Sequence, residues 1–554
     1  MMTRTLDPVL LEVMRNRFAA IAEEMGISLV RTSYSTNIKD RRDCSCALFD
    51  AAGNVIAQAE HIPVHLGVLP FGVRGAIAAI DRAALRPGDV IMHNDPYVGG
   101  THLPDMIVVA PVFHDGRVVG FVGNLAHHSD MGGMVAGSMP PRATEIYQEG
   151  IRFPPVKICK AGVLDEEILR IHANNVRTPH ESRGDLFAQM AANNVGARRF
   201  AELYEESGAE AVEGAIEALS AYTSRRMAAE LEKIPDGDYS FADVLEGDGV
   251  SDDPITIAVT VRSRGSRLVF DFSDSSPQVR GPVNAVMPIT ASVVYYVVKA
   301  VTDPTIPPNH GTFSNVEIVA PEGTIANARH PAATNAANGP TAQRMVDVLL
   351  GALYQAVPER VCAASTGSMN SVQLGGFRKA TREYFVHPET YGGGYGATHR
   401  ADGASGVQTH MTNTRNAPVE VLESTLPVRV LEYGLVPDSE GPGRNRGGFG
   451  IRRRFEILDE DVECMISTDR FANAPWGVED GQSARGTYVY LLRDGTTKRV
   501  AAKTYLQLRK GDQLVLETAG GGGWGKASER ARDLVQKDVD EGLVSPARAA
   551  EVYA

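Results

Sequence analysis

The spacing of apolar residues changes from a period of about 3.6 to a period of two near residue 43, so the chain must combine helices with sheets. Before that point, apolar residues recur at helical spacing from Leu11 to Met25, behind an Asp7-Pro8 pair that suits the first turn of a helix. After it, DCSCALFD and VIAQA alternate on either side of AAGN, and MIVVAPVF and VVGFVGNLAHH alternate on either side of HDGR. The sequence therefore predicts a helix followed by two β-hairpins.

The remainder of the chain keeps this mixture of patterns. Residues 185–233 are rich in Ala, Glu and Arg, and residues 286–301 and 341–357 also have the spacing of helices. Alternating apolar residues from Ile255 to Val261 predict a strand, and residues 420–520 contain short alternating segments separated by turns. SERARDLVQKDVDEGL, close to the C-terminus, predicts a polar helix.

These patterns predict a mixed α/β (α+β), multi-domain fold with a β-rich C-terminal third. A chain of 554 residues is long enough for roughly two to four ordinary domains. We expect an N-terminal domain at 1–240, a central α/β domain at 241–420, a β-rich domain at 421–525 and a helical tail at 526–554.

The composition of the chain argues against several classes of function. A net charge of −13 argues against nucleic acid as the main partner, because a phosphate backbone needs a concentrated surface of Lys and Arg. The longest apolar run, Ala291 to Val301, is too short to span a membrane, and the first residues lack a signal-peptide pattern. The five cysteines form neither a disulfide framework nor a paired zinc motif. We expect a cytoplasmic protein with reduced thiols and with no membrane or nucleic-acid partner.

Histidines are concentrated in one segment. Seven of the 14 lie between residues 61 and 128, where metal binding or acid-base chemistry is the usual reason for such a concentration. If Asp115-Gly116 is a two-residue turn, ideal pairing places Asp105 opposite Ala126, and Pro111 could shift that register by one residue. In either register Asp105 and His127 meet at the open end of the hairpin.

His102 precedes Asp105 by three residues in GGTHLPD, a loop whose glycines and proline can turn both side chains toward one point. Two imidazoles and a carboxylate form an open site that suits Zn²⁺, Mn²⁺ or Fe²⁺. Asp43 is the best candidate for a fourth ligand, with Asp40 as the substitute. The alternative is that these are ordinary polar residues around another kind of pocket.

Three other histidines of the segment are assigned different roles. His61 and His65, in HIPVHLG, are expected to support the ligands or the fold rather than to bind the ion, and His114 is expected to be exposed beside a turn.

No complete nucleotide-binding or nucleophile motif is present in the sequence. TAGGGGWGKA nearly matches a phosphate-binding loop, but Ala527 stands where a hydroxyl should hold Mg²⁺, so we interpret it as a structural glycine-rich turn. There is no GxSxG motif. If the reaction consumes ATP, another chain is expected to bind it. The polar stretch DGASGVQTHMTNTRNAP (402–418) could orient a planar amide substrate, or it could form turns that satisfy their own polar groups.

The order of the longer motifs resembles the hydantoinase B family. These motifs are DPVLLEVMRNRF, DCSCALFD, HIPVHLG, HNDPYVGGTHLPD, AHHSDMGG, EIYQEGIRFPPVKI, NGPTAQR, DGASGVQTHMTNTRNAP and TAGGGGWG. The family includes subunits of ATP-dependent N-methylhydantoinases and caprolactamase, part of 5-oxoprolinase, and related subunits of acetone and acetophenone carboxylases. The resemblance covers the chain from about Asp7 to its C-terminus.

The resemblance implies a division of labour between two kinds of subunit in a pairwise heterotetramer. A hydantoinase A-like partner binds ATP and phosphorylates the oxygen of a small cyclic amide, whereas the hydantoinase B-like chain carries a divalent metal, Zn or Mn. The positions that match the family's ligands are His102, Asp105 and His127, with an upstream acid that maps to Asp43.

The sequence predicts a mechanism but leaves its substrate open. Water activated by the metal would attack the phosphorylated carbonyl, and His128 or Asp130 would relay a proton to the leaving nitrogen. A hydantoin, 5-oxoproline or a lactam would each be compatible. The alternatives are a subunit of an ATP-dependent ketone carboxylase and a non-catalytic scaffold stapled by its metal.

Overall fold

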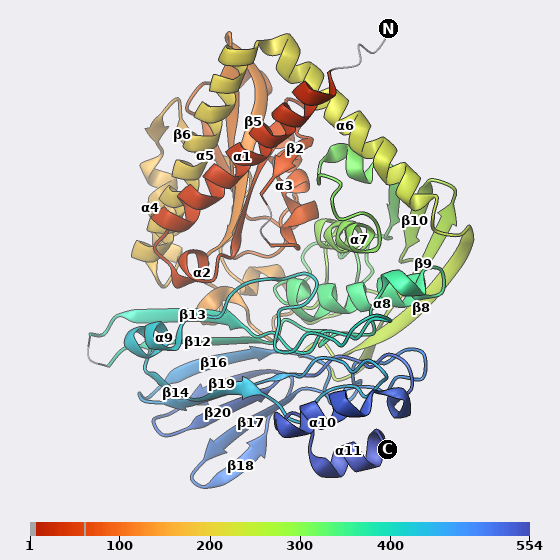
Figure 1. Ribbon diagram of the computed structural model, residues 1–554. Coiled ribbons are helices and arrows are strands. Elements are labelled where there is room, and N and C mark those ends of the chain that lie inside the picture. The colour runs from red at the N-terminus through yellow and green to blue at the C-terminus, as the bar shows by residue number, and fades with distance from the viewer. Residues whose placement is uncertain (1–6, 60–61, 380) are drawn as a thin grey trace.

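The structure is a computed structural model, and it describes residues 7–59, 62–379 and 381–554. Figure 1 shows an N-terminal part in red to yellow, a central part in green and a C-terminal part, rich in strands, in teal to blue. Helices and several separate sheets are combined in one chain. The predicted mixed α/β, multi-domain fold is therefore confirmed.

The N-terminal part is built on a seven-stranded antiparallel sheet with the order β2-β1-β5-β4-β3-β6-β7. Its strands are β1 (Cys44–Asp50), β2 (Val55–Gln58), β3 (Val90–His93), β4 (Asp105–His114), β5 (Arg117–His127), β6 (Val156–Lys160) and β7 (Val163–Leu164). Successive side chains of a strand face opposite sides of the sheet. Met106 and Val108 accordingly lie in the core that contains α1 and α5, whereas Ile107 and Val109 lie in the core that contains α3.

Helices cover both faces of this sheet (Figure 1). On one face lie α1 (Pro8–Thr32) and α5 (Pro179–Ser207), and on the other lies α3 (His65–Ala79). The helices α2 (Thr36–Lys39), α4 (Glu166–Asn175) and α6 (Ala209–Leu231) pack against α1 or α5. The start of α1 is as predicted, because the Asp7 side chain accepts a hydrogen bond from the Val9 amide at 3.0 Å and Pro8 occupies the first turn. The predicted helical segment at 185–233 is also confirmed, with a break between α5 and α6 at Gly208, where φ is +78°.

The hairpin of β4 and β5 turns as predicted. His114 pairs with Arg117, and Asp115 and Gly116 have φ values of +47° and +75°, the left-handed conformation that a tight two-residue hairpin turn requires.

The register of this hairpin differs from ideal pairing. Asp105 lies opposite His127, and not opposite Ala126 as the uninterrupted count predicted. The cause is a β-bulge, since Val112 pairs with Gly120 and Phe113 with Val118, which leaves Val119 without a counterpart in β4. The one-residue shift that the sequence allowed has thus occurred, close to the turn.

The central part combines two helices with a four-stranded sheet. The sheet has the order β11-β10-β9-β8, formed by β8 (Gly237–Glu246), β9 (Pro254–Arg264), β10 (Arg267–Asp271) and β11 (Val316–Val319). The helices are α7 (Met287–Val301) and α8 (Ala342–Tyr354). Because α8 packs on β8 and β9 while α7 contacts both α8 and α3, α7 joins the central part to the N-terminal part.

The C-terminal part is a sandwich of two sheets that share one hydrophobic core. The first sheet consists of β12 (Ser371–Phe377), β13 (Tyr384–Thr390), β16 (Val462–Ser467) and β19 (Lys503–Leu508). The second consists of β14 (Val428–Leu435), β15 (Ile451–Ile457), β17 (Tyr488–Arg493), β18 (Thr496–Arg499) and β20 (Gln513–Glu517). The first sheet takes two strands from before residue 420, and the domain boundaries remain predictions.

Short helices complete the chain. They are α9 (Val419–Thr425), α10 (Arg532–Asp540) and α11 (Pro546–Val552), with single turns η1 (Arg82–Ala84), η2 (Ala136–Ser138), η3 (Ile146–Gln148), η4 (His310–Phe313), η5 (Ala337–Thr341), η6 (Pro358–Arg360) and η7 (Ala527–Glu529). The predicted polar helix near the C-terminus corresponds to α10, and α11 adds a second helix beyond it.

The glycine-rich segment after β20 is packed against other backbone. A Cβ atom on Gly521 would lie 2.0 Å from the carbonyl oxygen of Tyr395, and one on Gly522 would lie 2.0 Å from that of Trp476. Such close backbone approach requires glycine, which supports the structural interpretation of TAGGGGWGKA.

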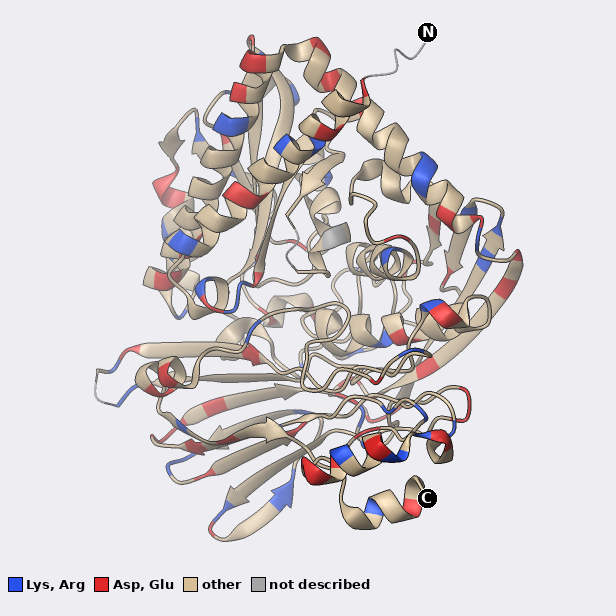
Figure 2. Cartoon of the chain, viewed as in Figure 1, with Lys and Arg blue, Asp and Glu red and all other residues tan. Residues whose placement is uncertain are grey.

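The described residues include no helix that is long and apolar enough to cross a membrane. Figure 2 shows basic and acidic residues interspersed along the helices rather than separated onto faces of one sign. All five cysteines are buried and unpaired, as expected for reduced thiols.

Candidate metal centre

The loop between β3 and β4 carries His102 and is held in place by one buried amide. Asn94, directly after β3, donates through Nδ2 to the carbonyl oxygens of Leu103 at 2.8 Å and Ile151 at 3.0 Å, and its Oδ1 accepts from the Phe153 amide at 2.7 Å. The loop is therefore fixed from within, and β4 begins at Asp105 in a defined position.

His102, Asp105 and His127 converge on one point. His102 Nε2 lies 3.1 Å from His127 Nδ1 and 3.2 Å from Asp105 Oδ1, and His127 Nδ1 lies 3.1 Å from the same oxygen. All three residues are buried, and in the part of the chain that the structure describes they form the one group of at least three His, Cys, Asp or Glu residues close enough to share an ion.

This arrangement fits a divalent metal ion. Neighbouring donors of a tetrahedral site with bonds of ~2.0 Å lie roughly 3.3 Å apart, close to the spacing of 3.1 to 3.2 Å among these atoms. Two imidazole nitrogens and one carboxylate oxygen are a donor set that Zn²⁺ and Mn²⁺ accept.

The ligand atoms are oriented by further buried contacts. His102 Nδ1 donates to the carbonyl oxygen of Asn335 at 3.0 Å, which leaves the lone pair on Nε2 facing the cluster. Asp105 Oδ2 accepts from the hydroxyl of Thr101 and from Asn338 Nδ2 at 3.2 Å, which leaves Oδ1 facing the imidazoles.

The electrostatics of the cluster favour the ionised form of Asp105. Burial by itself would raise the pKa of Asp105, but the adjacent imidazoles hold that pKa well below its usual range. Burial by itself would lower the pKa of His102, but Asp105 raises it. The carboxylate is therefore ionised at neutral pH, as a metal ligand must be.

Of the two upstream acids, Asp43 lies nearer the cluster. It lines the same cavity as the three ligands, and its carbonyl oxygen accepts from the His127 amide at 3.1 Å. Asp40 ends α2 and is absent from the lining of that cavity. Neither carboxylate belongs to the compact group of donors, so Asp43 as fourth ligand remains a proposal.

His128 and Asp130, the expected proton relay, are engaged elsewhere. His128 lies on the opposite face of the sheet, within 3.0 Å of the side chains of Ser182 and Gln189 on α5. Asp130 is fully buried and accepts from the guanidinium and the amide of Arg177. Neither side chain lines the cavity of the cluster, and their role as a proton relay stays a prediction.

The remaining histidines of the segment occupy different places. His65 is buried, lines the cavity and contacts the Ser45 hydroxyl through Nδ1 at 2.8 Å, as expected for a supporting residue. His61 lies outside the described residues. His114 is half-buried against Tyr204 rather than freely exposed.

Several residues of the site lie outside the histidine segment, so histidine spacing could not reveal them. Arg41 and Glu389 place one charge of each sign in the cavity wall. Glu149 accepts from the backbone amide of Asn335 at 2.9 Å and so supports the residue whose carbonyl orients His102. The sequence feature that could have pointed to Glu149 is its position in EIYQEG, which is part of one of the long motifs.

The polar stretch at 402–418 contributes only in part to this site. Thr412 and Thr414 line the cavity of the cluster. His410 instead lies within 3.3 Å of the Tyr296 and Tyr395 hydroxyls, beside a separate cavity.

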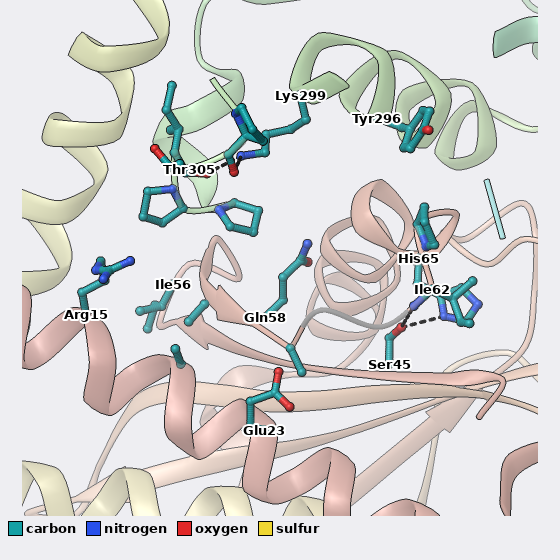
Figure 3. A pocket seen from close by; sticks show the side chains of 18 of the residues that line it. Arg15, Glu23, Ser45, Ile56, Gln58, Ile62, His65, Tyr296, Lys299 and Thr305 are labelled. Carbon is teal, nitrogen blue, oxygen red and sulfur yellow. Dashed lines mark hydrogen bonds between the residues drawn. The ribbon is translucent and has the colours of Figure 1, made fainter. Parts of the chain in front are cut away.

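A larger cavity, drawn in Figure 3, shares lining residues with the cavity of the cluster. The cavity at the cluster has a volume of about 60 Å³, and its neighbour, which shares Ile62 and His65 with it, has about 420 Å³. Figure 3 shows that Ser45 and His65 lie on one side of the larger cavity, with Tyr296 and Lys299 of α7 on the other.

Comparisons with known proteins agree over almost the whole chain. The family model for hydantoinase B/oxoprolinase matches residues 7–527. The chain is 40% identical to an uncharacterized protein of Methanocaldococcus jannaschii, covering 99% of this chain and 96% of that protein. It is 34% identical to a protein of Pseudomonas sp. that is named as a subunit of a D-/L-hydantoinase, covering 99% and 95%. It is also 34% identical to 5-oxoprolinase of Dictyostelium discoideum, covering 96% of this chain but 41% of that longer protein.

Solved structures give the same relationship. The ATP-dependent caprolactamase of Pseudomonas jessenii matches with a TM-score of 0.91 and 31% identity, covering 99% of this chain and 96% of that chain. A nucleotide-free acetone carboxylase matches with a TM-score of 0.91 at 21% identity, covering 99% and 80%, which shows a shared fold. The chain belongs to the hydantoinase B/oxoprolinase family.

Proposed function

We propose that this chain is the metal-binding subunit of an ATP-dependent hydrolase that opens a small cyclic amide, such as a hydantoin, 5-oxoproline or a lactam. The observation that carries the proposal is the convergence of His102, Asp105 and His127 at 3.1 to 3.2 Å in a buried cavity. Membership of a family that includes 5-oxoprolinases, and likeness to an ATP-dependent caprolactamase, support the substrate class.

The chemistry expected at the cluster is activation of water. When bound, Zn²⁺ or Mn²⁺ would supply the Lewis acidity that makes water a nucleophile at neutral pH. His102, Asp105 and His127 would hold the ion, with Asp43 as the proposed fourth ligand from the same cavity wall. The imidazoles provide neutral donors and Asp105 one negative charge, which leaves one positive charge for the proposed fourth ligand, Asp43, to balance.

A ring substrate needs more space than the cluster cavity offers. The cluster cavity has a volume of about 60 Å³, far below the ~300 Å³ of the smallest typical ligand pockets. The adjoining cavity of about 420 Å³ meets this need, and His65 and Ile62 stand between the two. We infer that the ring approaches the cluster past these two side chains.

ATP is proposed to bind to a separate hydantoinase A-like subunit, within a cytoplasmic heterotetramer. The glycine-rich segment around Gly521 is packed against Tyr395, which leaves its backbone no room to surround a phosphate. The chain covers 41% of the 5-oxoprolinase of D. discoideum, so more than half of that longer protein is available for another function. Phosphorylation of the amide oxygen by the partner would remove the resonance that makes amides poor electrophiles.

The proposal is tested by His102→Ala and His127→Ala in the complex assembled with its partner. Each variant removes one of three ligands, so we expect bound metal to fall below stoichiometry and ring opening to fall by about 100-fold or more. Metal content is measured by elemental analysis and ring opening with a panel of lactams and hydantoins plus ATP. His114→Ala, at the other end of β4, is the matched control and should retain both.

Three results would argue against the proposal. Unchanged ring opening without bound metal would remove the role of the cluster. ATP turnover that depends on bicarbonate would indicate a ketone carboxylase. If chelation melts the protein instead of only stopping turnover, the ion is a structural staple.

A further inference from the structure

Two amides in the wall of the cluster cavity have an oxygen for which the described residues supply no partner, namely Gln373 Oε1, which lies against Gly137, and Asn338 Oδ1. Asn338 is 7% exposed and lies in η5, a π-helical turn directly before α8. Single π-helical turns are rare and occur frequently at functional sites. The residue belongs to NGPTAQR, far in sequence from the histidine segment.

The orientation of this amide is fixed by Asp105. Asn338 Nδ2 donates to Asp105 Oδ2 at 3.2 Å, and because an ionised carboxylate only accepts, the NH₂ end must face it. The carbonyl end, Oδ1, therefore faces away from Asp105. It is buried and, among the described residues, accepts no hydrogen bond. A buried acceptor without a donor is costly, so its donor is expected to come from a ligand.

Space for that ligand is present beside the amide. The next residue, Gly339, has open surroundings, since a Cβ built on it would meet only Met369 Cβ, at 4.0 Å. Asn338, Gly339 and Met369 all line the cavity that contains the three metal ligands. The cluster cavity is too small for a whole ring, so only the amide edge of a ring that extends in from the adjoining cavity would lie beside the cluster and Asn338.

We propose that Asn338 Oδ1 accepts a hydrogen bond from the ring N–H of the cyclic amide, and that the protein is selective for rings whose nitrogen beside the attacked carbonyl carries a hydrogen. This inference rests on the proposed function and adds a recognition residue to it. The ring nitrogen is bonded to the carbonyl carbon, so fixing its N–H at Asn338, in the wall that the three ligands share, holds that carbon near the cluster.

The same contact remains useful after the carbonyl oxygen has been phosphorylated. The ring nitrogen then has imine character, and an acceptor beside it favours the form that keeps its proton. Keeping the proton leaves the adjacent carbon more electrophilic. A nitrogen that carries a methyl group has no hydrogen to donate, so Oδ1 would remain unpaired and the methyl group would crowd it.

The experiment compares 2-pyrrolidinone with N-methyl-2-pyrrolidinone as ligands of the metal-loaded complex, without ATP. Dissociation constants are measured by calorimetry or by competition, and metal content is measured on the same samples. We expect the wild type to bind the N–H ring at least ~10-fold more tightly, and Asn338→Ala to reduce this preference to about one. Thr412→Val, in the same cavity wall, is the matched control and should keep the preference.

A second variant separates the two ends of the amide. Asn338→Asp keeps an acceptor for the ring N–H but loses the donor to Asp105, so it should retain the preference while its metal affinity falls about 10-fold. Equal binding of both rings by the wild type, or a preference that survives in Asn338→Ala, overturns the inference. Because binding is measured without turnover, a preference for the N–H ring in a complex that opens no ring would support Asn338 while rejecting the proposed function.

Discussion

At the scale of single residues, the metal cluster depends on a buried carboxyl group that does not touch the ion site. Glu149 Oε1 accepts from the Thr334 amide at 2.7 Å and from the Asn335 amide and side chain at 2.9 Å, while Oε2 has no partner among the described residues. Burial raises the pKa of Glu149 to about 7, although these hydrogen bonds oppose the shift. The group therefore changes charge near neutral pH.

This shift predicts a pH dependence of stability. The pKa of Glu149 is raised to about 7 from 4.5, so the folded state binds the proton more tightly, and stability is lost as pH rises through that window. The loss is at most roughly 3 kcal/mol for a shift of this size. Glu149→Gln has no charge to gain, so denaturation between pH 5 and pH 8 should show a smaller decline for the variant. Identical pH profiles for the two proteins would contradict the assignment.

The candidate ligands were predictable from the sequence, but their surroundings were not. His102, Asp105 and His127 lie within one segment, so their proximity follows from a turn and two strands. Asn335 and Asn338 reach the site from more than 200 residues away, through a packing of α8 and η5 that no local pattern encodes. The expected proton relay finds no support in the geometry, because His128, one residue beyond His127, faces α5 on the other side of the sheet.

At the scale of elements, most helices and strands followed from periodicity. The start of α1, the hairpins β1–β2 and β4–β5, and the alternation of β9 all matched the pattern of apolar residues. The bulge at Val119 could not be located in advance, because neither Val118 nor Val119 carries a signal that distinguishes paired from unpaired backbone. From the sequence, the glycine-rich segments could be predicted only as turns. The segments that they pack against lie elsewhere in the chain and could not be predicted.

That packing predicts a strong effect of one added methyl group. Gly521→Ala would place Cβ 2.0 Å from the Tyr395 carbonyl oxygen, a backbone atom that cannot move aside easily, so we expect a loss of about 2 kcal/mol or more in the free energy of unfolding. Gly434→Ala, in edge strand β14, is the matched control, because nothing lies within 4 Å of its added Cβ. Both are measured by denaturant unfolding. Equal stability of the two variants would refute close packing at Gly521.

At the scale of the whole molecule, a buried ionic network joins the central part to the C-terminal sandwich. Asp469, which follows β16, accepts from Arg344 of α8 and from Lys503 of β19, each at 2.8 Å. All three side chains are buried. Separating the two parts would therefore leave charged side chains without their partners, which is energetically costly.

Removing the central charge of this network should destabilise the whole chain. Asp469→Asn leaves Lys503 buried without its counter-charge and leaves Arg344 with its longer contact to Asp243, at 3.5 Å, so we expect a loss of about 3–5 kcal/mol in the free energy of unfolding. Asp494→Asn, whose partner Arg509 is half-exposed, is the matched control and should cost less than ~1 kcal/mol. Denaturant unfolding in low and high salt measures both. A small loss at Asp469 that salt removes would show that water reaches the network.

The bulge in β5 gives the exposed hairpin tip an influence over chemistry at its far end. With Val119 looped out, His127 lies opposite Asp105; if Val119 were paired instead, with the turn unchanged, Ala126 would take that place and His127 would face the other side of the sheet. Deleting Val119 should keep His127 opposite Asp105, because the ladder from Val112 and Gly120 onward already omits it. A residue inserted into β5 and taken up by the ladder would instead separate two ligands of a distant ion.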